Sequence, residues 1–182
     1  MGTDRNEPQG DEAYYDEHSS VRGFDASLLE QPLHTLPTRH PLVYRETDSV
    51  TQAMRDMQRE RRGCVLITED GTGGSKLLGI FSERDVLLRV VDRGRNPATL
   101  PLRDVMTADP ECLPQTASIA WVLNKMAVGG FRHVPVLDEH GCPVRVVSVR
   151  DVVQFLVEFF PSEILNLPPE FRPPRSLERE GA

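Results

Sequence analysis

Ser82-Glu83-Arg84-Asp85 recurs in this chain as Ser148-Val149-Arg150-Asp151, and this repetition decides the fold. Each copy follows a short apolar run and opens a stretch whose apolar residues have helical spacing. The surroundings repeat as well, because Thr47 to Val50 matches Thr116 to Ile119 at an offset of 69 residues. We therefore predict a tandem duplication of a unit of roughly 60 residues.

Each unit is predicted to run strand, helix, strand, strand, helix. In the first unit the pattern predicts strands at 42–44, 64–68 and 77–81, a helix from Thr47 or Asp48 to about Arg61, and a helix from Ser82 to about Gly94. In the second it predicts strands near Cys112 and at 134–137 and 144–147, a helix from Thr116 or Ala117 to about Val128, and a helix from Ser148 onward. Two such units related by an approximate two-fold axis make an α/β fold with helices covering mixed sheets.

Charge is unevenly distributed along the chain. The net charge is −7, and residues 1–36 hold eight acidic and two basic residues. We expect residues 1–34 to form an acidic arm that is disordered or loosely attached, although Leu28-Leu29 could dock on a core. Residues 35–96 and 97–160 are predicted to be the two repeats, and 161–182 an extended proline-rich tail. The neutral body lacks the basic face of a nucleic-acid-binding protein.

Cysteine usage and the absence of an apolar run of membrane-spanning length predict a reduced, cytoplasmic protein. His133, His140 and Cys142 match no closed zinc pattern, so we expect no metal site. The glycine-rich stretch 71–76 has the wrong spacing for a phosphate-binding loop and is better explained as a hairpin. No nucleophile, base and orienting group recur at a recognisable spacing, so we expect no enzymatic activity.

The repeated Ser-x-x-Asp element has two interpretations. A serine before a helix bonds the first backbone N–H groups, and an acid three residues later suits the positive end of the helix dipole. Alternatively, Asp85 and Asp151 bind the hydroxyls of a ribose while Ser82 and Ser148 and the flanking Arg84 and Arg150 meet phosphate oxygens. A single copy of the element would favour helix capping. Its repetition in both units makes ligand binding a second interpretation to be considered.

Several motifs, taken in order, resemble the cystathionine-β-synthase (CBS) domain pair, or Bateman module. The resemblance runs from about Pro37 to Phe160 and rests on Thr47-Asp48-Ser49-Val50, Gly79-Ile80-Phe81-Ser82-Glu83-Arg84-Asp85, Val105-Met106-Thr107, Arg132-His133-Val134-Pro135-Val136 and Val146-Val147-Ser148-Val149-Arg150-Asp151. It implies a regulatory module with two clefts between the repeats, each able to take AMP, ADP, ATP or S-adenosylmethionine as a regulatory ligand, with no required cofactor.

The resemblance also implies which side chains meet that ligand: aspartates for the ribose, serines and threonines for ribose or phosphate, Arg132 and His133 for phosphates, and apolar strand residues for the adenine. Together with the arginines beside the aspartates, the expected ligand-binding residues are Thr47, Cys64, Val65, Ile80, Ser82, Arg84, Asp85, Thr116, Arg132, His133, Val134, Pro135, Val147, Ser148, Arg150 and Asp151.

Two departures from the repeat leave the occupancy of each cleft open. Arg145 stands where the first repeat has Gly79, and the first repeat lacks the proline found at Pro135. Because Arg145 makes the second cleft the doubtful one, we expect Asp85→Asn to weaken nucleotide binding more than Asp151→Asn. A nucleotide-free scaffold is the alternative function, as is an adaptor that works through its tails, for example through residues 164–171.

The helices that begin at Ser82 and Ser148 carry more apolar residues than one buried stripe needs, including Phe155, Phe159 and Phe160. Such excess apolar surface usually marks an interface. CBS domain pairs commonly associate two by two, so the resemblance implies the same assembly. We therefore predict a homodimer that passes the binding signal on through its own contacts or to a target protein, with no membrane partner.

Overall fold

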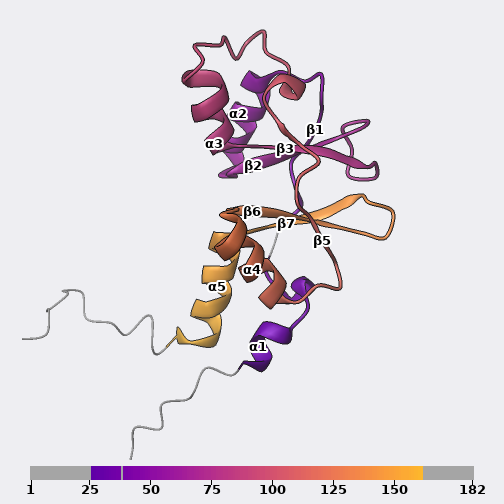
Figure 1. The fold of residues 1–182 in the computed structure, drawn as a ribbon, viewed down its shortest axis with the longest axis vertical. Coiled ribbons are helices and arrows are strands. Elements are labelled where there is room, and N and C mark those ends of the chain that lie inside the picture. Colours follow the sequence, from indigo (N-terminus) through magenta and orange to yellow (C-terminus); the bar gives the residue numbers. More distant parts are fainter. Residues whose placement is uncertain (1–25, 38, 162–182) are drawn as a thin grey trace, which may run out of the picture.

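A computed structural model describes residues 26–37 and 39–161. Two mixed sheets lie side by side across the middle of the molecule, with α2 and α3 beside one sheet and α4 and α5 beside the other (Figure 1). Both repeats have the order strand, helix, strand, strand, helix, which confirms the predicted α/β fold. Within the described ranges, no helix is long and apolar enough to cross a membrane.

The first sheet has the order β1-β2-β3-β4. Its strands are β1 (Val43–Arg45), β2 (Cys64–Thr68), β3 (Leu77–Ser82) and β4 (Thr107–Ala108). β1 and β2 are parallel, because α2 connects them, whereas β2 and β3 form an antiparallel hairpin around the glycine-rich turn. β4 was not predicted; it comes from the segment between the repeats and pairs with β3.

The second sheet repeats this arrangement with β5 (Leu113–Pro114), β6 (His133–Leu137) and β7 (Pro143–Ser148). β5 and β6 are parallel, and β6 and β7 are antiparallel. Each hairpin has a register shift at the same place, between Ile67 and Thr68 in the first sheet and between Val136 and Leu137 in the second. The repeat is therefore preserved down to the backbone irregularity.

The first helix of each repeat begins slightly later than predicted. α2 (Val50–Glu60) starts after Ser49, whose hydroxyl accepts the N–H of Gln52, while the Asp48 carboxylate accepts the N–H of Arg45 instead. α4 (Ile119–Gly129) starts after Ser118, so Thr116 and Ala117 lie outside the helix. Both predicted helix starts differ from the structure by one or two residues, because several neighbouring residues could serve as caps.

The second helices of the two repeats differ. α5 (Val149–Phe159) is a regular α-helix, with Val152 and Phe155 buried. Its counterpart is the short α3 (Glu83–Asp85), which continues as a π-helix, η2 (Val86–Val91). Leu87 and Val91 are 63% and 64% exposed, so the apolar residues of this helix do not all lie on one buried stripe.

Each repeat supplies a short segment to the other. The 3-10 helix η3 (Leu102–Asp104) packs on the first repeat, where Val50 donates its N–H to the Leu100 carbonyl. The 3-10 helix η1 (Leu33–Thr35) packs on the second repeat, where Ile119 donates its N–H to the Gln31 carbonyl. These contacts correspond at the 69-residue offset, so they give the pair its approximate two-fold relation.

Part of the acidic arm is ordered, which corrects the expectation for residues 1–34. α1 (Ser27–Glu30) and η1 are folded, and Leu28 and Leu33 are buried in the core of the second repeat. The docking considered for Leu28-Leu29 therefore occurs, since both leucines pack in this core. The rest of the arm, residues 1–25, and the tail from 162 onward lie outside the described residues.

Candidate functional site

Two cavities lie between the repeats, each at the start of the second helix of one repeat. The larger, about 540 Å³, is lined by Asp151 and is called the Asp151 cleft. The smaller, about 270 Å³, is lined by Asp85 and is called the Asp85 cleft. Small-molecule pockets typically measure about 300–1,000 Å³, so only the Asp151 cleft lies within that range.

The aspartate of each cleft is positioned by the serine three residues before it. Oδ2 of Asp151 accepts the backbone N–H and the hydroxyl of Ser148, both at 2.7 Å. Oδ2 of Asp85 accepts the same two groups of Ser82, at 2.9 and 2.7 Å. The capping interpretation is therefore correct for both copies. It leaves Oδ1 of each carboxylate for another partner, so capping and ligand binding are compatible.

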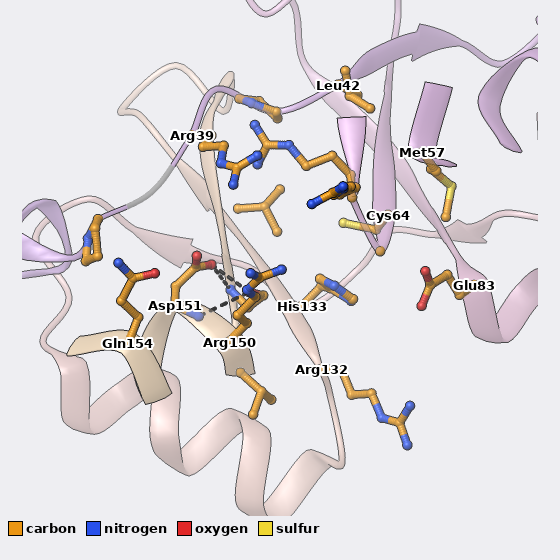
Figure 2. Close-up of a pocket in the computed structure, with 18 of the residues that line it drawn as sticks. Arg39, Leu42, Met57, Cys64, Glu83, Arg132, His133, Arg150, Asp151 and Gln154 are labelled. Atoms are coloured by element: carbon orange, nitrogen blue, oxygen red, sulfur yellow. Dashed lines mark hydrogen bonds between the residues drawn. The ribbon is translucent and has the colours of Figure 1, made fainter. Parts of the chain in front are cut away.

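Positive charge distinguishes the Asp151 cleft. Five arginines line it against two carboxylates, and none of the five makes an ion pair with another described residue. They are Arg39, Arg61, Arg62, Arg132 and Arg150. Figure 2 shows Arg150 and Asp151 at the start of α5, facing Cys64 and Met57 of the first repeat across the cavity. Burial and the neighbouring charge of Arg39 lower the pKa of Arg62. An anion in this cleft would relieve that repulsion.

The two clefts meet at a shared wall of Gly63, Glu83, Arg132 and His133. A Cβ atom at position 63 would lie 2.6 Å from Nε2 of His133, so glycine is required for the imidazole to pack there. Burial lowers the pKa of His133, and the carboxylates of Glu83 and Asp151 oppose this. Gly63 corresponds to Arg132 of the second repeat, since the carbonyls of these two residues accept the N–H groups of Glu83 and Val149 at the starts of the second helices. The His133 side chain lies between the two clefts and lines both.

The Asp85 cleft carries balanced charge. Arg84, Arg89 and Arg132 line it together with Glu83, Asp85 and Glu111. The carboxylate of Asp85 is also paired with an arginine, since Nε of Arg89 lies 3.3 Å from Oδ1 of Asp85. Leu88, Phe131 and Pro135 supply apolar surface. The two clefts are thus built from corresponding elements, but they differ in volume, in charge and in whether the aspartate is paired with an arginine.

Eleven of the predicted ligand-binding residues line a cleft. They are Cys64, Ser148, Arg150 and Asp151 in the Asp151 cleft, Ile80, Ser82, Arg84, Asp85 and Pro135 in the Asp85 cleft, and Arg132 and His133 in both.

The other five predicted residues lie elsewhere. Val65, Val134 and Val147 are buried in the hydrophobic cores, because successive strand residues point to opposite faces and these point inward. Thr47 and Thr116 are exposed and line neither cavity in the described part of the chain. The predicted adenine surface and hydroxyl contacts are therefore smaller than expected from the sequence.

Sequence reasoning missed the residues that cross between repeats. Arg39, Pro41 and Leu42 reach the Asp151 cleft from the segment before β1. The corresponding residues of the other cleft include Pro110, 69 residues after Pro41. The 69-residue offset would have found this pair if it had been extended toward the N-terminus. Arg61, in a left-handed conformation with φ of 52°, carried no comparable signal.

Arg145 does not obstruct the Asp151 cleft. Its guanidinium donates to the carbonyl of Leu33, 3.3 Å away, and the residue does not line the cavity. The departure from Gly79 therefore affects the packing of the crossing segment. In the first repeat that position is filled by Met106, whose sulfur would lie 2.6 Å from a Cβ at Gly79.

Cysteine and metal chemistry find little support in the described residues. Burial raises the pKa of the Cys64 thiol to about 12, so it stays protonated and serves as an apolar wall of the Asp151 cleft. Within residues 26–37 and 39–161, no group of three or more His, Cys, Asp or Glu side chains could hold a metal ion.

Comparison with models of known protein families identifies the family of this chain. The model of the CBS domain matches residues 33–92 and again residues 102–158. The chain belongs to the CBS domain family. Both matches begin at the 3-10 helix that packs on the opposite repeat, at Leu33 and Leu102, so this CBS domain unit includes its exchanged segment.

Among curated relatives, CBS domain-containing protein CBSCBSPB3 of Arabidopsis thaliana is 28% identical over 148 residues, covering 80% of this chain and 26% of the relative. CBSCBSPB1 of the same plant is 37% identical over 112 residues, covering 61% and 20%. This CBS domain chain thus spans about a quarter or less of the length of these Arabidopsis relatives.

The fold is shared by solved structures, two examples being proteins from Pyrococcus horikoshii and Pyrobaculum aerophilum. An uncharacterized conserved protein from Pyrococcus horikoshii superposes with a TM-score of 0.63 at 21% identity, covering 79% of this chain and 98% of that one. The CBS domain protein PAE2072 from Pyrobaculum aerophilum, complexed with AMP, superposes with a TM-score of 0.62 at 24% identity, covering 70% and 97%. At these identities the likeness establishes the CBS domain fold alone.

Proposed function

We propose that this CBS domain pair is a regulatory module without catalytic activity, and that it binds an adenosine nucleotide carrying a phosphate chain in the Asp151 cleft. One observation carries the proposal: Asp151 is fixed by Ser148 through one oxygen, and it lines a cavity of about 540 Å³ together with five arginines. A carboxylate suits the ribose hydroxyls, and guanidinium groups suit phosphate oxygens.

The charge of the cleft orders the candidate ligands. Five arginines against two carboxylates favour ligands in proportion to their negative charge, so ATP and ADP should bind more tightly than AMP. S-adenosylmethionine carries a positive sulfonium and should bind weakly. Cys64, Leu42 and Val146 supply the apolar surface for a base. The AMP complex of the Pyrobaculum protein supports an adenosine ligand in this fold.

A ligand titration of nucleotide-free protein tests this function. Thermal unfolding would be followed with ATP, ADP, AMP, adenosine, S-adenosylmethionine and inorganic triphosphate. A ligand present at a hundred times its dissociation constant adds about 2.7 kcal/mol to the free energy of unfolding. We expect the order ATP, ADP, AMP, adenosine. Equal shifts with triphosphate alone would remove the role of the nucleoside, and no shift with any ligand would favour the nucleotide-free scaffold.

Transmission of the signal is proposed to run through α5. Its first turn holds Asp151 in the cleft, and Val149 both lines the cleft and is 43% exposed. Val153 and Phe159 continue the exposed apolar surface of the same helix. A ligand that moves the start of α5 therefore changes a surface suited to protein contact, and it shifts the assembly only by its different affinity for the two states.

That surface supports the homodimer as the assembly. Large apolar side chains are exposed on the second helix of each repeat and on α4: Leu87, Leu88, Val91, Trp121, Val128, Val149, Val153 and Phe159. Light scattering at tens of micromolar should give twice the chain mass. A Val153→Glu variant should shift the mass toward the monomer, whereas Glu158→Lys, a charge change at an exposed position of the same helix, should leave it unchanged.

A further inference from the structure

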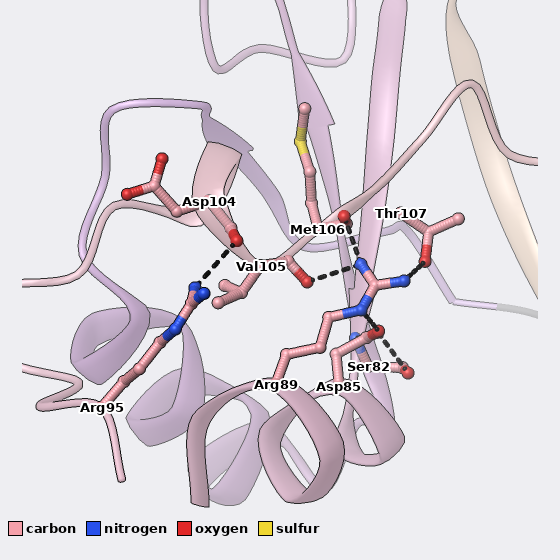
Figure 3. Close-up of polar contacts among 8 residues, drawn as sticks. All are labelled: Ser82, Asp85, Arg89, Arg95, Asp104, Val105, Met106 and Thr107. Atoms are coloured by element: carbon pink, nitrogen blue, oxygen red, sulfur yellow. Dashed lines mark hydrogen bonds and ion pairs between the residues drawn. The ribbon is translucent and has the colours of Figure 1, made fainter. Parts of the chain in front are cut away.

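Arg89 makes several contacts inside the Asp85 cleft (Figure 3). Nε lies 3.3 Å from Oδ1 of Asp85, and Nη1 donates to the carbonyls of Val105, at 2.9 Å, and Met106. Nη2 donates to Oγ1 of Thr107 at 3.2 Å. One side chain therefore connects the carboxylate to the segment that crosses from the other repeat.

These contacts use the acceptors that a ribose needs. Oδ2 of Asp85 is taken by Ser82, and Oδ1 faces Arg89. In the Asp151 cleft, Oδ2 is taken in the same way by Ser148, but Oδ1 has no hydrogen bond or ion pair with any residue that the structure describes. The two aspartates are equivalent in sequence, and only the first is occupied by its own chain.

The difference follows from one substitution between the repeats. After the hairpins the repeats correspond at an offset of 66 residues, so Arg89 corresponds to Phe155. Phe155 is 2% exposed and packs in the core of the second repeat, where its ring lies 4.5 Å from that of Phe159. A side chain committed to the core cannot reach Asp151, so the second cleft has no internal occupant of this kind.

We propose that Arg89 is a built-in occupant of the Asp85 cleft, so that the chain binds one nucleotide, at Asp151, and the Asp85 cleft becomes a second ribonucleotide site only when Arg89 is displaced. This inference rests on the proposed function of the Asp151 cleft. The guanidinium fork supplies charge and directional donors to several acceptors at once, which a ligand has to replace. The small volume of the Asp85 cleft, about 270 Å³, agrees with an occupied site.

We call the occupation of the Asp85 cleft by Arg89 its closure. The number of ATP molecules bound per chain, measured by calorimetry, tests this closure. Arg89→Gln keeps N–H donors for the carbonyls of the crossing segment but removes the charge that holds Asp85, and Arg89→Met removes both. We expect one site per chain in the wild type and two in both variants. Arg93→Gln is the matched control, because this arginine of the same region is exposed and lies 3.8 Å from Asp92 rather than Asp85. It should retain one site.

A double variant distinguishes the two sites. Asp151→Asn should lose most of the wild-type binding, by tenfold or more, and adding Arg89→Gln should restore one site through Asp85. Two sites in the wild type, or one site in every folded Arg89 variant, would overturn the closure and leave the proposed function standing. Absence of binding in every variant would instead overturn the proposed function.

A thermal double-mutant cycle decides the closure without nucleotide. If Arg89 holds Asp85, then Asp85→Asn should lower the melting temperature in the wild-type background and lower it less in the Arg89→Gln background. Equal losses in both backgrounds would show that the two side chains act independently, which would overturn the closure even if no ligand binds.

Discussion

The Asp85 cleft and the Asp151 cleft come from the same repeated plan and have become different sites. Each has a serine-fixed aspartate at the start of a helix, and each takes a crossing segment from the opposite repeat. In the first, Arg89 contacts the aspartate; in the second, the corresponding residue, Phe155, is in the core. A repeated motif therefore fixes where a carboxylate lies, while the residue one helical turn later decides whether it is available.

The two clefts also differ in charge, because the Asp151 cleft is more positive than the Asp85 cleft. Positions that correspond at the 69-residue offset hold Arg39, Arg61 and Arg62 in the Asp151 cleft, but Ala108, Gly130 and Phe131 on the other side. The Asp151 cleft gains three arginines by these differences, and Phe131 adds apolar surface to the Asp85 cleft. This arrangement supports a phosphate-bearing ligand on one side and a closed, neutral site on the other.

The largest expected effect separates the two aspartates. Asp151→Asn removes a charged acceptor from the available cleft and should weaken ATP binding by about 1.5–3 kcal/mol, which is roughly ten- to hundredfold. Asp85→Asn should change ATP affinity far less, the reverse of the order expected from the sequence. Calorimetry on both variants checks this. A greater loss from Asp85→Asn would assign the ligand to the first cleft.

A second prediction concerns a substitution that makes the charged Asp151 cleft more like the neutral Asp85 cleft. Arg39→Ala installs the residue found at position 108 and should weaken ATP binding by about 1–2 kcal/mol, because one charge-assisted contact is lost at an exposed position. Adenosine, which has no phosphate, should bind equally to both proteins. Arg103→Ala, at an exposed arginine that lines neither cleft, is the control. An equal loss for ATP and adenosine would place Arg39 away from the phosphates.

Stability without ligand gives a smaller difference. Asp85→Asn breaks a partly buried ion pair, with side chains 11% and 42% exposed, and should lower the free energy of unfolding by about 0.5–1 kcal/mol. Asp151→Asn breaks no ion pair with a described residue and should cost less than about 0.5 kcal/mol. Chemical denaturation measures both. A larger cost for Asp151→Asn would indicate that its carboxylate has a structural partner.

The smallest expected effect concerns the shared wall. Burial lowers the pKa of His133, so the folded protein binds a proton less readily there than the unfolded chain. Stability from this residue is therefore present above the unfolded pKa of about 6.5 and is lost as pH falls below it. His133→Gln should therefore reduce the difference in the free energy of unfolding between pH 7.5 and pH 5.5. Urea unfolding at pH 5.5 and 7.5 tests this, and an unchanged difference would contradict it.

Much of the fold follows from local chemistry. The spacing of apolar residues, the Ser-x-x-Asp caps and the glycine-rich turn 71–75 located β2, β3, β6, β7 and α5 to within a residue or two. Helix starts at α2 and α4 were less certain, because Thr47, Asp48 and Ser49 are all good capping residues. The acidic arm was misjudged as far as Leu33, since three buried leucines in a polar stretch show no periodicity until the second repeat surrounds them.

The sequence by itself determined the duplication, the α/β order and the two serine–aspartate pairs, because each depends on residues within one turn or one hairpin of each other. Only the tertiary structure decided which cleft is available. The contacts of Arg89 with Val105 and Met106, the place of Arg39 in the Asp151 cleft and the hydrogen bond from Arg145 to Leu33 all join residues that are distant in the chain or that belong to different repeats. Their side-chain directions depend on how the repeats exchange segments, and no local pattern encodes that exchange.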